Sequence, residues 1–256
     1  MDVKIKRGVR GQVTLFIIIA VLLVGVIILF FLLRGIIPTN ILQPRMPSIQ
    51  DDIEKCIRDN ARNAIDIMLP QGGYLNPGNY KLYKNNKVAY LCYNSNYYAS
   101  CINQEPLYVS HLENEIKAYI TPKLKDCFYA LEQEYKKRNY QVLSGDLSLE
   151  INLNPKQVNI EINRKLTLTK NEETKKYEEF KAKVSSPIYD LAIVVSLIVD
   201  SEARECDFDY WKFKNNYPAY HIERTFTEDN TRIYQVSRNN KILIFATRSC
   251  ALPPAS

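Results

Sequence analysis

The chain has 256 residues and a formal net charge of +6 at pH 7. Residues 1–11 contribute +3 and Arg34 contributes +1, so residues 35–256 carry only +2. A nearly neutral region of this size lacks the basic surface of a nucleic-acid-binding protein, so no nucleic-acid partner is expected. The chain has only eight glycines and no low-complexity run, which favours a folded protein over a disordered one.

An uncharged apolar stretch runs from Val13 to Leu33. All but three of its residues are Val, Ile, Leu or Phe, and as a helix it would extend roughly 30 Å, the thickness of the hydrocarbon core of a bilayer. A buried helix of a globular core would need polar caps or an amphipathic face, and neither is present. We therefore predict a transmembrane helix over residues 12–34, which contacts the membrane through residues 13–33.

The flanks of this stretch predict its orientation. Basic N-terminal flanks stay in the cytoplasm, so residues beyond Arg34 are expected outside the cell. A cleaved secretory signal is the alternative, but its apolar region has about 7–15 residues and precedes small residues at A-x-A spacing. Here Gly35-Ile36-Ile37-Pro38 follows, so the helix is expected to remain in the mature protein. The N-terminal flank has one acid, Asp2, against four bases, Lys4, Lys6, Arg7 and Arg10.

The junction Arg10-Gly11-Gln12-Val13-Thr14 places a basic residue, a glycine and a glutamine directly before the apolar helix. It resembles the class III signal peptides of archaeal type IV pilin-like precursors. In that family a prepilin peptidase cleaves between the positions that match Gly11 and Gln12. The resemblance covers about the first 35 residues. It implies removal of a cytoplasmic leader, residues 1–11, and packing of the retained helices as a filament core.

Two features depart from the pilin pattern. Phe16 stands where bacterial-type pilins carry a glutamate, although archaeal members often lack that acid. Pilins also tend to continue the span as a long amphipathic helix, whereas Pro38, Pro44 and Pro47 each remove an amide donor and disfavour helix here. We predict a semi-rigid linker over residues 35–47. The layout also resembles single-pass surface proteins of small-genome archaea.

Residues 48–256 are expected to form the extracellular region, with possible subdomains 48–145 and 146–256. Ser48, with Asp51 three residues later, is typical of a helix N-cap, and the apolar stripe that follows reaches Met68. Pro70-Gln71-Gly72-Gly73 should end this helix. A second capping box, Ser110-x-x-Glu113, predicts a helix that Pro122 kinks or divides in two.

Seven tyrosines fall within residues 74–103. Most are expected to be strand residues that half face the core, and Asn85-Asn86 predicts a hairpin turn between strands. The loop Asn94–Ser100 is the best candidate for an exposed contact surface, through Tyr97 and Tyr98, because tyrosine offers a large amphipathic area at low entropic cost.

From residue 147 the apolar period changes from 3.6 to 2, which predicts an antiparallel meander over residues 147–184. An apolar helix follows Pro187; acids at Asp190 and Asp200 leave it too short for a second span. A second meander is predicted over residues 219–247. The expected fold class is therefore α+β, with helices packed on antiparallel meanders.

All six cysteines follow the apolar stretch, and an even number in an oxidising compartment favours disulfides. A zinc site is disfavoured because there is no C-x-x-C and the two histidines, His111 and His221, lie far apart in sequence. Six cysteines allow 15 pairings. Local geometry favours a staple across a short loop, a pin between two helices and a tie across the last region: Cys92–Cys101, Cys56–Cys127 and Cys206–Cys250.

No nucleophile, metal or phosphate motif occurs, so no catalytic residue, metal ligand or cofactor is predicted. The acidic run from Asp200 to Asp209 fails the EF-hand pattern and is expected to be a solvated helix end. The expected function is a membrane-anchored, pilin-like structural or adhesion protein that acts by contact or assembly, as a homo-oligomer, as a filament or with other surface proteins. The alternative is a membrane-tethered extracellular enzyme or ligand-binding module.

Overall fold

The computed structural model describes the backbone of residues 10–33 and 48–253, and the side chains of residues 16–30 and 48–253. It divides into two units, residues 1–47 and 48–256. The first contains helix α1 (Arg10–Leu33), whose described side chains are all exposed. Among the described residues, none of the helices reaches the length and hydropathy of a membrane span. The predicted linker and most of the predicted leader, residues 1–9, lie outside the described residues.

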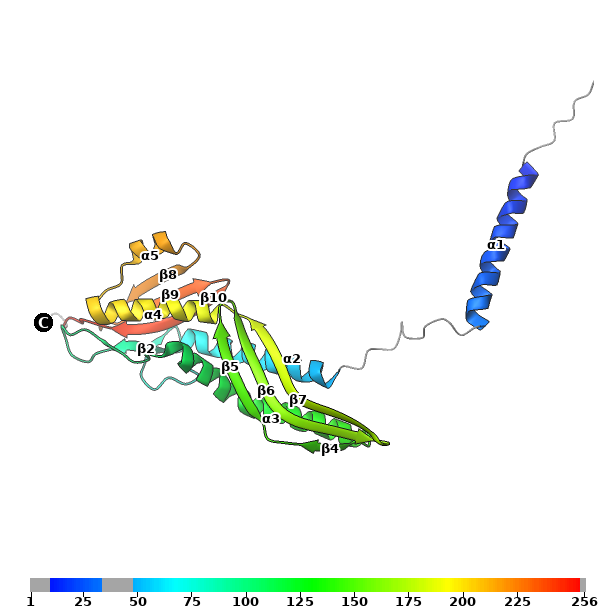
Figure 1. Cartoon of the computed structure of the whole chain (residues 1–256). Coiled ribbons are helices and arrows are strands. Elements are labelled where there is room, and N and C mark those ends of the chain that lie inside the picture. Colours follow the sequence, from blue (N-terminus) through cyan, green and yellow to red (C-terminus); the bar gives the residue numbers. More distant parts are fainter. Residues whose placement is uncertain (1–9, 34–47, 254–256) are drawn as a thin grey trace, which may run out of the picture. The chain divides into compact units, whose positions relative to one another are not determined.

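The second unit is an α+β fold with two sheets (Figure 1). In the larger sheet the strand order is β1-β2-β10-β9-β8, and β3 also pairs with β2. The β9–β10 and β8–β9 hairpins are antiparallel, as expected for the second meander. The strands are β1 (Tyr80–Tyr83), β2 (Asn86–Tyr93), β3 (Ile102–Asn103), β8 (His221–Phe226), β9 (Arg232–Arg238) and β10 (Lys241–Arg248).

The expectation of purely antiparallel meanders is wrong for this sheet, because β2 and β10 are parallel. Five consecutive residues of β2, Val88 to Cys92, are buried, as is usual for a parallel strand covered on both faces. The first hairpin forms where expected, but its turn residues are Lys84 and Asn85, both with positive φ, and Asn86 already belongs to β2.

The smaller sheet is antiparallel, as the period of two predicts, and its central strand is β6. One edge of β6 pairs with β7. The other edge pairs with β5 along its first half, Gln157 to Asn163, and with β4 along its second half, Leu166 to Thr169. Leu149, Ile151 and Leu153 face the core, each 6% exposed or less. The strands are β4 (Gln141–Ser144), β5 (Ser148–Asn154), β6 (Gln157–Lys170) and β7 (Glu173–Ser185).

Helix α2 (Ile49–Met68) begins and ends as its sequence predicts. The Asp51 N–H donates to Ser48 Oγ at 3.1 Å, which confirms the N-cap. A 3₁₀ turn, η2 (Leu69–Gln71), follows, and Gly73 then has φ +85°. A Cβ on Gly73 would lie 2.5 Å from Leu112 Cδ2, so this glycine allows the turn to approach the next helix.

The second predicted N-cap is wrong, because helix α3 (Tyr108–Lys137) does not begin at Ser110. The helix begins at Tyr108, so Ser110 lies inside it and caps nothing. Glu113 Oε1 instead accepts the N–H of Leu153 at 2.8 Å, which joins α3 to β5. Pro122 lies within one continuous helix, so of the two expected effects, a kink or a division, the division into two helices does not occur.

One hydrophobic core joins the regions 48–145 and 146–256. It includes the buried face of α4 (Ile188–Glu205) and residues of α2, α3 and both sheets. The rings of Phe128 in α3 and Phe180 in β7 lie edge to face, with centroids 5.2 Å apart. A short helix that the sequence did not predict, α5 (Tyr210–Asn216), follows α4.

Strand β1 is tied to the turn between β8 and β9 by an ion pair, since Lys81 Nζ lies 2.7 Å from Asp229 Oδ2. Partial burial alone would raise the pKa of Asp229, but the bonds from Lys81 and Thr227 lower it well below the ordinary value for aspartate. The carboxylate therefore stabilises the fold above pH about 4, and this contribution is lost as the pH falls further.

Replacement D229N should therefore lower the free energy of unfolding at neutral pH, and its difference from the unmodified protein should shrink as the pH falls from about 5 towards 2. Urea titrations at a series of pH values measure this. Replacement K81M is the matched control: it removes the ion pair from the other side but leaves the bonds from Thr227 and the Thr231 N–H to Asp229, so it should show the same trend with a smaller amplitude. A difference that stays constant across this range would contradict the assignment.

Candidate functional site

Three disulfides brace the second unit, and they are the three pairs expected from the sequence. Cys56–Cys127 joins α2 to α3, with Cα atoms 6.7 Å apart. Cys92–Cys101 joins two residues nine positions apart, and Cys206–Cys250 ties the end of α4 to the segment after β10. The structure contains no free cysteine among the described residues. The three bridges indicate an oxidising, extracellular location.

The loop Asn94–Ser100 projects between Cys92 and Cys101 and carries the predicted contact residues. Tyr97 is 47% exposed and Tyr98 is 70% exposed. Tyr98 has φ +59°, a conformation that costs energy for a residue other than glycine, so surrounding bonds must hold it. We call residues 94–100 the tyrosine loop; the rings of Tyr97 and Tyr98 face solvent from it.

Backbone hydrogen bonds to the C-terminal segment fix the tyrosine loop. The Tyr98 N–H donates to Ala251 O at 2.9 Å, and the Cys250 N–H donates to Ala99 O at 2.8 Å. Arg248 donates through Nη1 to Asn94 O, and its guanidinium lies 5.4 Å from the centre of the Tyr97 ring. The loop thus continues the contact between β2 and β10, at the end of this unit opposite the start of α2 (Figure 1).

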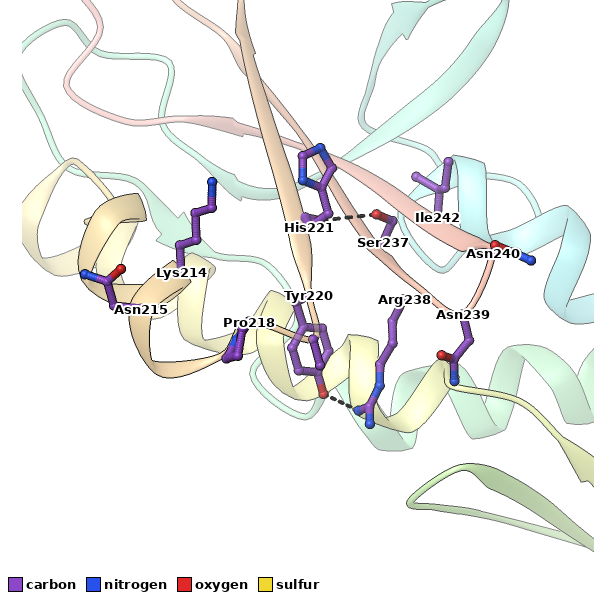
Figure 2. A pocket seen from close by; sticks show the side chains of 11 residues that line it. Lys214, Asn215, Pro218, Tyr220, His221, Ser237, Arg238, Asn239, Asn240 and Ile242 are labelled. Atoms are coloured by element: carbon purple, nitrogen blue, oxygen red, sulfur yellow. Dashed lines mark hydrogen bonds between the residues drawn. The ribbon is translucent and has the colours of Figure 1, made fainter.

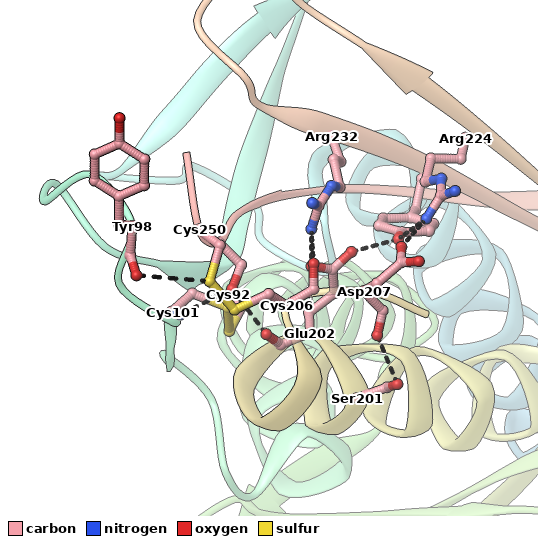
Figure 3. Close-up of polar contacts among 12 residues, drawn as sticks. Cys92, Tyr98, Cys101, Ser201, Glu202, Cys206, Asp207, Arg224, Arg232 and Cys250 are labelled. Atoms are coloured by element: carbon pink, nitrogen blue, oxygen red, sulfur yellow. Dashed lines mark hydrogen bonds and ion pairs between the residues drawn. A yellow bond between two sulfur atoms is a disulfide. The ribbon is translucent and has the colours of Figure 1, made fainter. Parts of the chain in front are cut away.

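A buried ionic cluster lies beneath this corner of the fold (Figure 3). Glu202 is fully buried, and its carboxylate accepts hydrogen bonds from Arg232 Nη1 and from the Tyr234 hydroxyl. Arg232 also donates to Cys206 O at 2.6 Å. The prediction of a solvated helix end over residues 200–209 is therefore wrong at Glu202, because this residue continues the buried stripe of α4.

The cluster connects to the tyrosine loop through Ser249. The Ser249 hydroxyl donates to Glu202 O at 2.8 Å and accepts the Cys101 N–H at 3.0 Å. Burial raises the pKa of Glu202 above its usual value, although Tyr234 and Arg232 oppose the shift. Burial and the adjacent carboxylate also raise the pKa of Tyr234, so its hydroxyl remains a donor at neutral pH.

Next to the cluster, Asp207 and Arg224 form a second ion pair at the surface (Figure 3). Burial alone would raise the pKa of Asp207, but the Phe208 N–H and Arg224 bind the carboxylate and hold its pKa below the usual value. The carboxylate is therefore ionised at neutral pH, and its side chain is 63% exposed.

A hollow of about 710 Å³ lies at the ends of β8, β9 and β10 (Figure 2). Some of its polar groups bond to one another or to neighbours: Arg238 donates to the Tyr220 hydroxyl at 2.6 Å and lies 3.0 Å from Asp190. The Ser237 hydroxyl donates to the His221 carbonyl. His221 is exposed, and its Nε2 lies 3.1 Å from Glu223 Oε1. Among the described contacts, none joins His221 to a cysteine.

The other histidine, His111, is largely buried. His111 has a side chain only 13% exposed, packed between the rings of Tyr74 and Tyr108, with Nε2 3.1 Å from Gly73 O. It thus helps to hold the turn after α2 against α3. Among the described residues, no group of three or more His, Cys, Asp or Glu side chains is arranged to hold a metal ion.

Comparison with protein-family models, with curated proteins and with solved structures gives no match for this chain.

Proposed function

We propose that this protein is a membrane-anchored surface protein of the type IV pilin-like class, whose extracellular unit acts by contact or assembly. The exposed apolar surface of α1 carries the proposal. Its described side chains, Phe16 to Phe30, are exposed on all sides, and within Val13–Leu33 the sequence has no charge. Apolar surface of this extent requires lipid or other apolar helices to cover it.

Charge and disulfides support one orientation across the membrane. The basic residues 1–11 favour a cytoplasmic N-terminus, and the three disulfides favour an oxidising compartment for residues 48–256. The tyrosine loop is then the contact surface of the extracellular unit. Its two exposed rings stand on a corner fixed by two disulfides and a buried ionic cluster, so contact would cost little ordering entropy.

The N-terminus of the mature protein tests this proposal. Protein recovered from the membrane fraction should begin at Gln12, because a prepilin-type peptidase removes residues 1–11 and leaves the apolar helix. Intact-mass measurement and N-terminal sequencing read out the cleavage. The matched variant G11L should retain Met1 and stay in the membrane fraction, since the apolar run is unchanged.

The outcomes separate the parts of the proposal. A membrane-bound protein that begins at Met1 would contradict the pilin-like class. The apolar helix would then serve only as an uncleaved membrane anchor. Recovery of the unmodified protein in the aqueous fraction with six free thiols would contradict both the anchor and the extracellular location.

A further inference from the structure

A hollow of about 540 Å³ opens beside Trp211, the only tryptophan of the chain. This residue lies on α5 and is 72% exposed, an unusual position for an indole ring in a folded protein. The tyrosine loop does not line the hollow. The lining residues are Asp207, Phe208, Asp209, Tyr210, Trp211, Ile222 and Arg224.

The walls of the hollow are held in place by bonds within the fold. Phe208 and Ile222 form an apolar floor, 7% and 4% exposed. Asp209 Oδ1 accepts the N–H of Lys212 at 3.0 Å, which fixes the start of α5. The Ser201 hydroxyl donates to Asp207 O at 2.8 Å, directly after the disulfide-bonded Cys206 (Figure 3). The hollow is therefore present before any ligand binds.

The polar groups at the rim include both hydrogen-bond donors and acceptors. Asp207 presents an ionised carboxylate, and Arg224 holds it through Nη1 while the Arg224 side chain remains 28% exposed. Two acids and one base line the hollow, which disfavours an anionic ligand. Asp207 is already paired with Arg224, and Asp209 already accepts the N–H of Lys212, so neither acid is left free for a cation. A suitable ligand is therefore neutral, with an apolar face for the indole ring and hydroxyl groups for the carboxylate and the guanidinium.

A pyranose ring combines these properties. One face consists of C–H groups that pack on an aromatic ring, and its vicinal hydroxyls each donate and accept hydrogen bonds. We propose that the hollow beside Trp211 binds a ring of a neutral saccharide, with Trp211 as the stacking platform and Asp207 and Arg224 as hydroxyl partners. This inference rests on the proposed surface role, because a surface protein that acts by contact meets glycans of cells or matrices.

The single tryptophan gives a direct measurement. The full-length protein is titrated in lauryldimethylamine oxide micelles, whose headgroup is not a sugar, with maltohexaose, cellohexaose, chitohexaose and mannohexaose. At least one probe should shift the Trp211 emission to shorter wavelength and saturate at concentrations on the order of 1 mM, typical of weak binding.

Calorimetry with that probe tests the residues. W211A should abolish the heat of binding, and D207A should weaken binding about tenfold. Y129A is the matched control, because Tyr129 on α3 is an aromatic residue 65% exposed that lines neither the hollow nor the tyrosine loop, and this variant should bind as the unmodified protein does. Thermal unfolding followed by circular dichroism checks that each variant is folded.

Two results would overturn the saccharide site: no change in emission with any of the four probes at about 10 mM, or equal binding by W211A and the unmodified protein. Neither depends on the cleavage of residues 1–11 or on the membrane, because both are measured in detergent solution. A protein that binds a saccharide but begins at Met1 would keep this site and contradict the pilin-like class alone.

Discussion

Replacement R232M is expected to lower the free energy of unfolding at neutral pH by about 3–5 kcal/mol, because it leaves the fully buried carboxylate of Glu202 without its ionic partner. Domains of this kind have only about 5–15 kcal/mol of stability in total, so the loss should be large. It should become smaller at lower pH, where Glu202 takes up a proton and no longer needs a cation. Urea unfolding at several pH values measures both effects.

Two further variants make this prediction specific. The double replacement E202M/R232M removes both charges and should recover stability to within about 1–2 kcal/mol of the unmodified protein. R224M disrupts the neighbouring pair with the exposed Asp207, and its cost should stay below about 1 kcal/mol. Equal losses for R232M and R224M would show that burial of Glu202 does not determine the energy of the pair.

Removal of the Cys56–Cys127 bridge by C56S/C127S should cost about 4 kcal/mol, because the bridge closes a loop of 71 residues in the unfolded chain. Removal of Cys92–Cys101, which closes nine residues, should cost only about 2.5 kcal/mol on the same loop-entropy relation. Denaturant titration of the two double variants under non-reducing conditions compares them directly.

The shorter bridge is the matched control, since both changes replace two sulfurs with hydroxyls. The order of the two losses is the critical result. A greater loss from C92S/C101S would mean that strain or packing in the tyrosine loop, rather than loop entropy, governs the contribution of the bridges. In that case the exposed position of Tyr98 should also change, which proteolysis of the loop would detect.

Local signals in the sequence predicted the elements well where a single interaction defines an end. Ser48 begins α2 through one hydrogen bond, and the alternation of Leu149, Ile151 and Leu153 gave the buried face of β5. The second capping box failed because the same residue types have another use: Glu113 bonds the backbone of β5 instead of its own helix. A motif of two residues does not specify whether the fold places its own helix or a neighbouring strand within hydrogen-bond distance of the glutamate.

The parallel contact between β2 and β10 could not be placed from the sequence, because it joins segments about 150 residues apart and no local turn specifies it. The continuous apolar run of β2 did carry a signal, since a strand buried on both faces is typical of parallel pairing.

The candidate site was predicted only in part. The six cysteines and the two exposed tyrosines of the loop were found from spacing and composition. Glu202 was missed because it stands in an acidic run, although it lies four residues after Ile198 and seven after Val195 on the buried stripe of α4. Trp211 was missed because a single aromatic residue in a short segment has no periodicity, and its exposure depends on how α5 lies on the fold.

The pairing of β2 with β10 also has a consequence for biosynthesis. During translation β2 leaves the ribosome about 150 residues before its partner, so the larger sheet cannot close until the C-terminal strand has emerged. Cys92 and Cys101 are only nine positions apart, so their disulfide can form early. The disulfide of Cys206 can form only after Cys250, near the end of the chain, has been synthesised. A nascent chain halted before β10 would therefore leave the apolar strand β2 without its partner along one edge and depend on chaperones.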